Sequence, residues 1–318
     1  MPGEFELIAR HFTRPVHRAA LGVGDDCALL RLAPGMQLAV SSDMLVEGRH
    51  FLSTVAPERL GHKALAVNLS DLAACGAEPL AFTLALALPR ADDAFLAPLA
   101  RGMLALADAQ GIELVGGDTT AGPLNLCITV FGQVPAGQAL LRSGAAAGDD
   151  IWVSGQLGDA RLALEVFRGT LCLPGGAFET VRRAMELPQP RVALGLALRG
   201  LASSAIDLSD GLVGDLGHVL QRSAVGAVVQ VDELPRSATL AAQPVDVQQQ
   251  CLLAGGDDYE LLFTAPPRHH EAVRAAGARA SVTVTRIGRI EPGRALQLLD
   301  RTGAPLTARF SGFDHFAA

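Results

Sequence analysis

Hydrophobic and polar positions along the chain follow patterns that predict both helices and strands. In the first half, helices are predicted over 4–12, from Pro57 to Cys75 and over 92–110, and the last two are followed by Gly76 and Gly111 as helix stops. A turn at Pro34-Gly35 separates two short apolar runs. Strands are predicted at 27–32, 37–42, 82–88, 112–116 and 125–134.

The second half mixes the same two patterns. Helices are predicted over 158–168, 176–186, 191–201 and 211–222, and strands over 151–155, 205–208, 227–231, 259–264, 282–290 and 295–299. Between the halves, the segment 136–150 is small, polar and rich in glycine, which is typical of a domain boundary. We therefore expect an α+β protein of two α/β-type domains, spanning 1–140 and 148–318.

The composition restricts the class of protein. With 49% hydrophobic and 19% charged residues the chain can bury a large core, and its net charge of −7 argues against a nucleic-acid partner, which needs a clustered basic face. The start MPGEFELIARHFTR is not a signal peptide, and no apolar run approaches the roughly 18 residues of a membrane span. Five cysteines without a C-x-x-C pair indicate reduced core thiols in a cytoplasmic protein.

Aspartates in short turns of small residues are the strongest indication of chemistry. The motifs are GVGDDCA (22–28), SSDMLVEGRHF (41–51), NLSDLAACG (68–76), GGDTT (116–120), IDLSDGL (206–212) and GGDDYELLF (255–263). Carboxylates beside glycines suit hard cations and, through them, phosphates. The single lysine, Lys63, follows His62, so the chain has no G-x-x-x-x-G-K-S/T phosphate loop.

Each of these turns also has a simpler structural explanation. Asp25 and Asp26 could be ordinary turn residues, although adjacent carboxylates repel each other unless a cation lies nearby. Asp43 could cap a helix where SSD follows the strand LAV, and Ser209 or Asp210 could cap the helix that follows them. GGDTT at the end of the strand IELV could be a common turn.

The helix over 57–75 carries the most specific pattern. Ala64, Asn68, Asp71 and Cys75 fall at i, i+4, i+7 and i+11, which places them on one face. The other faces are apolar, so we expect a buried helix, and a buried carboxylate needs metal ions or strong donors as partners. Six such motifs at the ends of elements predict a site for several Mg²⁺ ions that neutralises phosphates and supports phosphoryl transfer.

In this order, the six motifs closely resemble those of thiamine-monophosphate kinase, a family in the superfamily of aminoimidazole ribonucleotide synthetase, selenophosphate synthetase and the hydrogenase maturation factor HypE. The resemblance runs from Phe5 to the closing GFDHF at 312–316. It implies a PurM-like fold, with an N-terminal ATP- and metal-binding domain and a C-terminal PurM-like domain, and a homodimer whose N-terminal sheets join into a barrel. It implies ATP-dependent, Mg²⁺-assisted phosphorylation of thiamine monophosphate to thiamine diphosphate, by direct transfer between phosphates.

The resemblance also implies roles for individual residues, none of them a covalent nucleophile. The expected metal ligands are Asp26, Ser41, Ser42, Asp43, Asp71, Asp118, Asp207 and Asp210. The expected ATP contacts are Gly117, Asp118, Arg142 and Ser209, and the expected substrate contacts are His50, Glu260 and Phe313. Asp25 stays ambiguous, because only one of the adjacent pair need reach the metals. In ARGMLALAD (100–108), Arg101 stands near the position where the resemblance leads us to expect an aromatic nucleotide contact.

Two alternatives stay open. The first is another ATP-using enzyme of the superfamily: a selenophosphate synthetase would be expected to carry a Cys or selenocysteine with a Lys near its N-terminus, and a HypE-like protein a C-terminal Cys. Here the first cysteine is Cys27, the lysine is Lys63 and the sequence ends HFAA. The second is a non-catalytic module that binds Ca²⁺ or Mg²⁺, although no EF-hand-like loop D-x-D/N-x-D/N-G is present.

Overall fold

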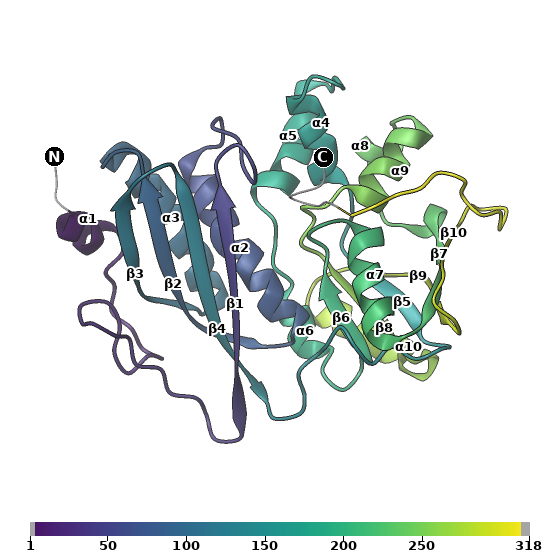
Figure 1. The fold of residues 1–318 in the computed structure, drawn as a ribbon, viewed down its shortest axis with the longest axis horizontal. Helices are drawn as coiled ribbons and strands as arrows, with labels where there is room; N and C mark the ends of the chain where they lie inside the picture. The colour runs from purple at the N-terminus through teal and green to yellow at the C-terminus, as the bar shows by residue number, and fades with distance from the viewer. Residues whose placement is uncertain (1–3, 313–318) are drawn as a thin grey trace. The chain divides into compact units, whose positions relative to one another are not determined.

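The computed structural model describes residues 4–312, and the chain divides into two compact units. Unit 1 consists of Met1–Leu72 and Ala77–Gly137, and unit 2 of Ala73–Gly76 and Gln138–Ala318. Figure 1 shows the order of the helices and strands along the chain. Within the described residues, no helix is both long enough and apolar enough to cross a membrane.

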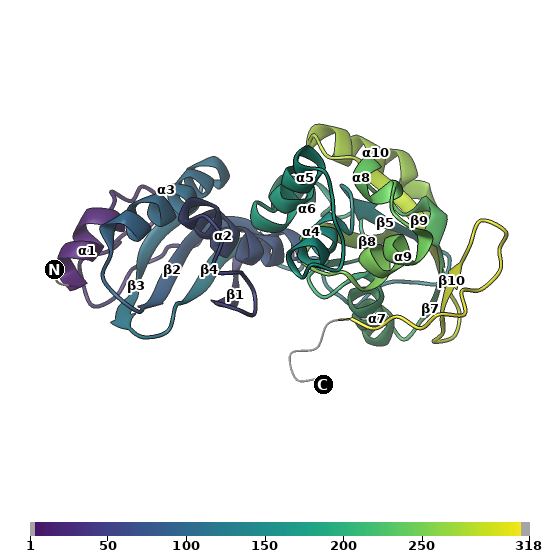
Figure 2. The same cartoon turned by 90° about the horizontal axis from the view of Figure 1, so that it is seen from above.

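Unit 1 is a four-stranded sheet with helices on one face. Its strands are β1 (Met36–Val46), β2 (Glu78–Leu88), β3 (Glu113–Ala121) and β4 (Asn125–Pro135), in the order β1-β4-β2-β3. β2 and β3 run parallel, and β4 runs antiparallel to both β1 and β2. Helices α2 (Pro57–Ala74) and α3 (Asp93–Gln110) cover one face of the sheet, which we call the helix face, and α1 (Glu4–His11) lies beside α3 (Figure 2). The opposite side is the open face.

Helices α2 and α3 confirm the helix predictions at 57–75 and 92–110. Asp92 caps α3 by accepting the N–H of Ala94 at 2.9 Å, and Gly111 ends it with a φ of 64°. The two helices pack closely at two glycines, because a Cβ on Gly61 or Gly102 would collide with backbone atoms of the other helix. Helix α2 is therefore held firmly against its neighbour.

The predicted strand pair at 27–32 and 37–42 is wrong in its first member. Residues 12–35 form an irregular segment without a strand, in which isolated bridges join Leu21 to Leu29 and Val23 to Asp25. Its apolar side chains pack on the open face of the sheet against Phe131 and Val115 instead of pairing as a strand. Strand β1 pairs with β4 along its whole length, and it continues beyond the predicted end to Val46.

Unit 2 is a six-stranded mixed sheet with helices around it. Its strands, in the order β10-β7-β9-β5-β8-β6, are β5 (Asp150–Ser154), β6 (Ser204–Asp207), β7 (Gly226–Gln230), β8 (Leu261–Ala265), β9 (Val284–Glu291) and β10 (Leu296–Leu299). Its α-helices are α4 (Asp159–Phe167), α5 (Gly175–Glu186), α6 (Val192–Ala197), α7 (Leu212–Ser223), α8 (Ala238–Ala241), α9 (Val245–Ala254) and α10 (His270–Arg279). The sequence patterns predict the strands but miss α8, α9 and α10.

Strand β5 is buried on both faces. Ile151 and Val153 join the core that α4, α7 and α9 complete. Trp152, which points the other way, stacks on Phe263 and meets the ring of His270 in α10 edge-on, with centroids 4.8 Å apart. Both faces of this sheet are therefore covered by helices, which explains the continuous apolar run of β5.

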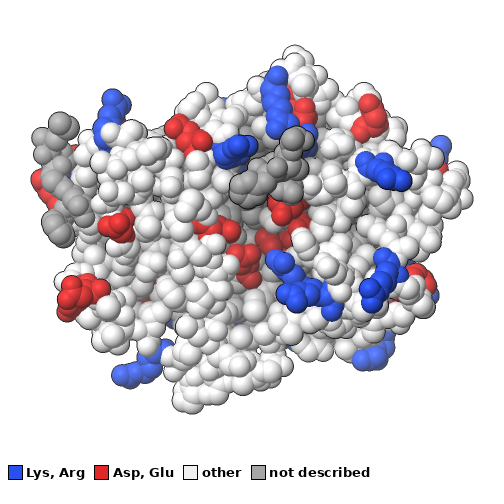
Figure 3. Space-filling view, viewed as in Figure 1, with Lys and Arg blue, Asp and Glu red and all other residues white. Residues whose placement is uncertain are grey.

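All five cysteines are free, and the expectation that they are core thiols is wrong for most of them. Cys251 is buried, whereas Cys27 and Cys172 are exposed and the other two are half-buried. On the face shown in Figure 3, charged side chains lie in separate small groups between wide uncharged areas.

Candidate metal and phosphate site

Ser41, Asp43 and Asp71 meet at a corner between β1 and α2. The Ser41 hydroxyl donates to Oδ2 of Asp71 at 2.5 Å, and the backbone N–H of Asp43 donates to Oδ1 of Asn68 at 3.0 Å. Contrary to the sequence analysis, the SSD motif does not follow a strand, because these residues lie inside β1. Ser41 and Asp43 alternate with Ser42, so both belong to the helix face.

Asn68 orients this corner. Its side chain is almost completely buried, and Nδ2 donates to the carbonyl of Ala64 one helical turn earlier at 3.0 Å. Its Oδ1 is therefore directed at β1, where it accepts the N–H of Asp43. The predicted polar face of the helix is confirmed for Asn68 and Asp71, which both contact β1.

The oxygen donors of this corner fit a hard cation. A hydroxyl and two carboxylates come from Ser41, Asp43 and Asp71, and Mg²⁺ typically takes one or two protein carboxylates while water and substrate phosphates complete its shell. Within residues 4–312, no three His, Cys, Asp or Glu side chains form a metal cluster by themselves. The corner therefore suits a cation that is shared with a phosphate better than a closed structural metal site.

Ser42 and Asp118 lie on the open face. The strand registers align Asp43 with Ile128, Leu84 and Gly117 in one row, and Met44 with Cys127, Ala85 and Asp118 in the next. Asp43 and Asp118 are on the two edge strands, three strand spacings or about 14 Å apart, and their side chains point to opposite faces. Within one unit 1 they cannot bind the same ion.

Gly117 has a structural requirement of its own. Its φ is +149°, and a Cβ at this position would collide with the backbone of Leu84 in β2. The GGDTT motif, predicted to end a strand, instead lies within β3. The glycine therefore permits close pairing of β2 with β3, whether or not a ligand approaches it.

The remaining predicted residues of unit 1 lie in loops. Asp25 and Asp26 are exposed, and the N–H of Asp26 donates to the Asp25 carboxylate at 3.0 Å. His50 follows β1, and its Nδ1 accepts the N–H of Val46 at 3.0 Å. This contact requires an unprotonated Nδ1, so a neutral His50 ring carries its proton on Nε2, where it acts as a donor.

In unit 2, a turn after β6 brings three backbone N–H groups onto one carboxylate. Ser209, Asp210 and Gly211 each donate to Oδ2 of Asp215 at 3.1 Å. Asp215 is buried in the first turn of α7, and burial together with the nearby charge of Asp210 raises its pKa to about 7. Asp207 is the last residue of β6 and is also buried.

Asp215 was missed by the sequence analysis, which considered Ser209 and Asp210 as the caps of this helix. Neither side chain makes the cap; the acid inside the first turn reaches back to the N–H groups of the preceding residues. The available signal was an acidic residue in the first turn of a helix that a glycine precedes.

Glu260, an expected substrate contact, is engaged by other residues of unit 2. It is buried, and Ser154 Oγ donates to its Oε2 at 2.5 Å. Arg191 donates to the same oxygen through Nε at 2.6 Å and also pairs with Oε1 through Nη2. The carboxylate is thus held by a bidentate arginine and a hydroxyl.

Comparisons with known proteins cover the whole chain. The family models for the N-terminal and C-terminal domains of AIR synthase related proteins match residues 24–134 and 146–301. The thiamine-monophosphate kinase of Salmonella typhimurium is 45% identical over 322 residues, covering 99% of this chain and 98% of that protein. The chain belongs to the thiamine-monophosphate kinase family.

Solved structures agree with this assignment. The crystal structure of thiamine-monophosphate kinase from Stenotrophomonas maltophilia K279a has a TM-score of 0.85 and 44% identity, covering 94% of this chain and 95% of that chain. AaThiL, solved in complex with AMPPCP and TMP, has a TM-score of 0.77 and 28% identity, covering 90% of this chain and 89% of that chain. The fold is therefore the two-domain, PurM-like fold of the thiamine-monophosphate kinase family, with mixed sheets.

Three further residues that the sequence analysis discussed, Arg142, Arg101 and Phe313, lie in different parts of the chain. Arg142 is exposed in the connection between β4 and β5, and its carbonyl accepts the Ser223 hydroxyl at 3.3 Å. Arg101 forms a bidentate pair with Glu58 of α2, with both distances 3.1 Å. Phe313 lies outside the described residues. Contacts of Arg142 and Phe313 with ligands stay predictions.

Proposed function

We propose that the chain transfers the γ-phosphate of ATP to thiamine monophosphate and forms thiamine diphosphate. The observation that carries this proposal is the match to thiamine-monophosphate kinases over both domains. The complex of AaThiL with AMPPCP and TMP supports an ATP-like nucleotide as donor and thiamine monophosphate as acceptor. We assign nucleotide and metal binding and dimerisation to residues 1–140, and the second PurM-like domain to 148–318, in a cytoplasmic enzyme.

The corner of Ser41, Asp43 and Asp71 is the proposed centre for one of several Mg²⁺ ions, and Asp26, Ser42, Asp118, Asp207 and Asp210 are further proposed ligands of these ions. Bound Mg²⁺ would supply positive charge that offsets the repulsion between the two phosphate-bearing substrates. The chain's own part is to present preoriented oxygens. Ser41 holds one oxygen of Asp71, and Asn68 fixes the backbone at Asp43. For Ser42, the side chain faces away from this corner, so its contribution there would come from its backbone.

The residues around the site favour direct transfer between phosphates. Phosphoryl transfer needs alignment and charge stabilisation more than covalent chemistry. The acceptor phosphate is already anionic at neutral pH, so no general base is required to activate it. His50, with its Nδ1 occupied by Val46, can donate from Nε2 and position an anion. Incubation with γ-labelled ATP alone should leave the protein unlabelled, and a label that can be chased into product would contradict direct transfer.

A homodimer is the proposed assembly, with the open faces of two sheets enclosing a barrel. Leu38, Val40 and Met44 on the open face of β1 are 47%, 55% and 50% exposed. Three large apolar side chains on alternate positions of one edge strand form a surface that a second copy would cover.

The test is an assay of ATP consumption and thiamine diphosphate formation with thiamine monophosphate, thiamine or neither. We expect ATP consumption only with thiamine monophosphate, and none in excess EDTA. ATP consumption that is independent of thiamine monophosphate would favour a selenophosphate synthetase-like or HypE-like enzyme. Metal binding without ATP consumption would favour a non-catalytic module.

A further inference from the structure

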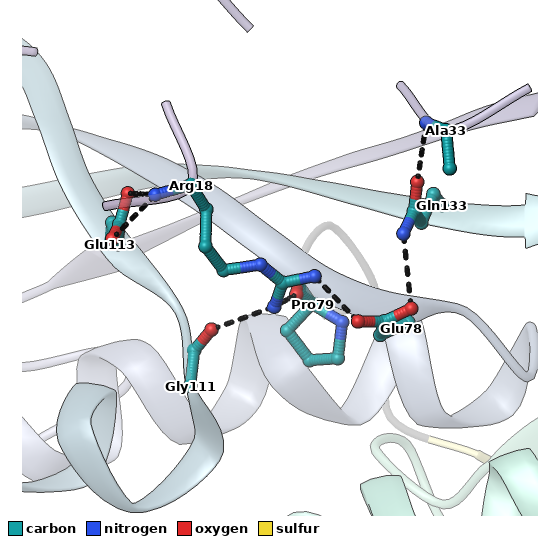
Figure 4. A network of polar contacts seen from close by, with 7 residues as sticks. All are labelled: Arg18, Ala33, Glu78, Pro79, Gly111, Glu113 and Gln133. Carbon is teal, nitrogen blue, oxygen red and sulfur yellow. Dashed lines mark hydrogen bonds and ion pairs between the residues drawn. The ribbon is translucent and has the colours of Figure 1, made fainter. Parts of the chain in front are cut away.

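The irregular segment between α1 and β1 is fastened to one end of the sheet. Residues 12–35 contain no helix or strand, and ordered loops of this length are uncommon unless they serve a function. Figure 4 shows the polar network that holds the segment, made by residues where β2 and β3 begin and β4 ends. The network grips the segment at two points that are far apart in sequence.

The first point is around Arg18. The carboxylate of Glu113 accepts the backbone N–H groups of His17 at 2.6 Å, Arg18 at 3.0 Å and Ala19 at 3.0 Å. The Arg18 guanidinium donates to the backbone carbonyls of Pro79 at 2.7 Å and Gly111 at 3.0 Å, which lie next to the starts of β2 and β3.

The second point is Ala33, and Glu78 joins it to the first. The side-chain carbonyl of Gln133 accepts the N–H of Ala33 at 3.2 Å, and its amide nitrogen donates to Oε2 of Glu78 at 3.0 Å. The other oxygen of Glu78 accepts Arg18 at 2.5 Å. Arg18, Glu78 and Gln133 therefore form a continuous clasp that fixes both ends of the enclosed loop.

The enclosed loop carries the adjacent carboxylates at its tip. Its two sides meet where Ala20 donates to the carbonyl of Leu29 at 2.8 Å and Leu29 donates to Leu21 at 3.0 Å. Asp25 and Asp26 follow in the exposed turn, and no ion pair engages either of them within residues 4–312. The charge of Arg18 is already paired with Glu78, so it does not compete for these carboxylates.

We propose that the clasp of Arg18, Glu78 and Gln133 is a positioning device that presents the turn 22–28, with Asp25 and Asp26, to the Mg²⁺-bound nucleotide. The inference rests on the proposed kinase function. Two adjacent carboxylates repel each other, and a loop that is not held at its base has more freedom to separate them. The clasp removes this freedom before the ion arrives, which lowers the ordering cost of binding it.

The test uses Arg18→Met and Gln133→Met, which open the clasp at its two ends without touching Asp25 or Asp26. Arg14→Met is the matched control. Arg14 belongs to the same irregular segment, but it pairs with Asp108 of α3 and takes no part in the clasp. Two quantities are measured: the Mg²⁺ concentration for half-maximal activity, and amide hydrogen exchange at Leu21 and Leu29 with and without Mg²⁺ and AMPPCP. Thermal unfolding of each variant confirms that it is folded.

We expect both clasp variants to need about tenfold more Mg²⁺, as for the loss of groups that orient metal ligands, while kcat at saturating Mg²⁺ stays near that of the parent. Leu21 and Leu29 should exchange faster in both variants and not in Arg14→Met. Unchanged exchange in the clasp variants, or faster exchange with an unchanged Mg²⁺ requirement, would overturn the inference. If the parent does not phosphorylate thiamine monophosphate, the kinase proposal fails. Amide hydrogen exchange at Leu21 and Leu29, compared between the parent and the clasp variants at increasing Mg²⁺, still tests the clasp.

Discussion

The hydroxyl of Ser41 donates to Oδ2 of Asp71 at 2.5 Å and links strand β1 to helix α2. This contact places the Asp71 carboxylate at the helix face of β1, the face to which Asp43 also belongs. We expect Asp71→Asn to keep the fold and lower kcat by at least about 10²–10³-fold, because it removes a charged ligand from the proposed Mg²⁺ corner. Steady-state kinetics and thermal unfolding measure the two effects. Activity within a few-fold of the parent would contradict the proposed corner.

The neighbouring serines of β1 provide a matched pair. Ser41 faces Asp71, whereas the Ser42 hydroxyl lies on the open face, 3.0 Å from that of Thr129. We expect Ser41→Ala to lower kcat or Mg²⁺ affinity by about tenfold and Ser42→Ala to have a much smaller effect on both. Equal losses of kcat or Mg²⁺ affinity in the two variants would show that the strand register does not decide which serine side chain contributes to metal binding.

Asp215 gives a pH dependence of stability with a definite sign. Its pKa is about 7 in the folded protein, against 3.8 as the ordinary value, because of burial and the charge of Asp210. Between these values the folded state retains a proton that the unfolded state has released, so this group lowers stability as the pH rises through that window. Asp215→Asn cannot titrate and should lose this slope in urea unfolding without divalent cations. The same slope in parent and variant would contradict the assignment.

Arg142 tests the nucleotide side of the proposal. Its side chain is exposed in a glycine-rich connection, and its backbone carbonyl is held by Ser223. We expect Arg142→Ala to raise the KM for ATP more than the KM for thiamine monophosphate, since a flexible arginine there can pair with phosphates. Arg168→Ala, at the end of α4, is a control for loss of an exposed charge. An unchanged KM for ATP would leave Arg142 as a surface residue.

The exposed apolar side chains of β1 test the dimer. Val40→Glu would place a charge in the middle of the open-face row formed with Leu38 and Met44. We expect this variant to be a monomer by analytical ultracentrifugation, because burying an unpaired charge in an apolar interface is costly. Arg90→Glu, which places a glutamate at an exposed position outside this row, should not alter the oligomeric state. A parent protein that is already monomeric would refute the barrel.

Much of the local structure could be predicted because local interactions decide it. The ends of α3 follow from the Asp92 cap and the left-handed Gly111, and the spacing of Asn68 and Asp71 places both on one side of α2. Helices α9 and α10 were missed because their apolar positions are interrupted by glutamines in one and consist mainly of alanine and glycine in the other. Packing against neighbouring elements, α7 and α4 for α9 and α6 and β9 for α10, supplies the stability that these sequences do not indicate.

The sequence by itself determined which oxygen-bearing residues are available, and the helical period that keeps Asn68 and Asp71 together. Only the tertiary structure decided which carboxylates share a face. A period of two leaves the choice of face to the register, and the register places Asp43 against α2 but Asp118 on the open face, three strands away. Ser41 and Asp43 resembled a strand end because polar residues seldom point inward. In the fold they belong to the helix face, where Asp71 and Asn68 of α2 accept their hydrogen bonds. The clasp at Arg18 and the turn at Asp215 likewise depend on partners that meet only when the chain is folded.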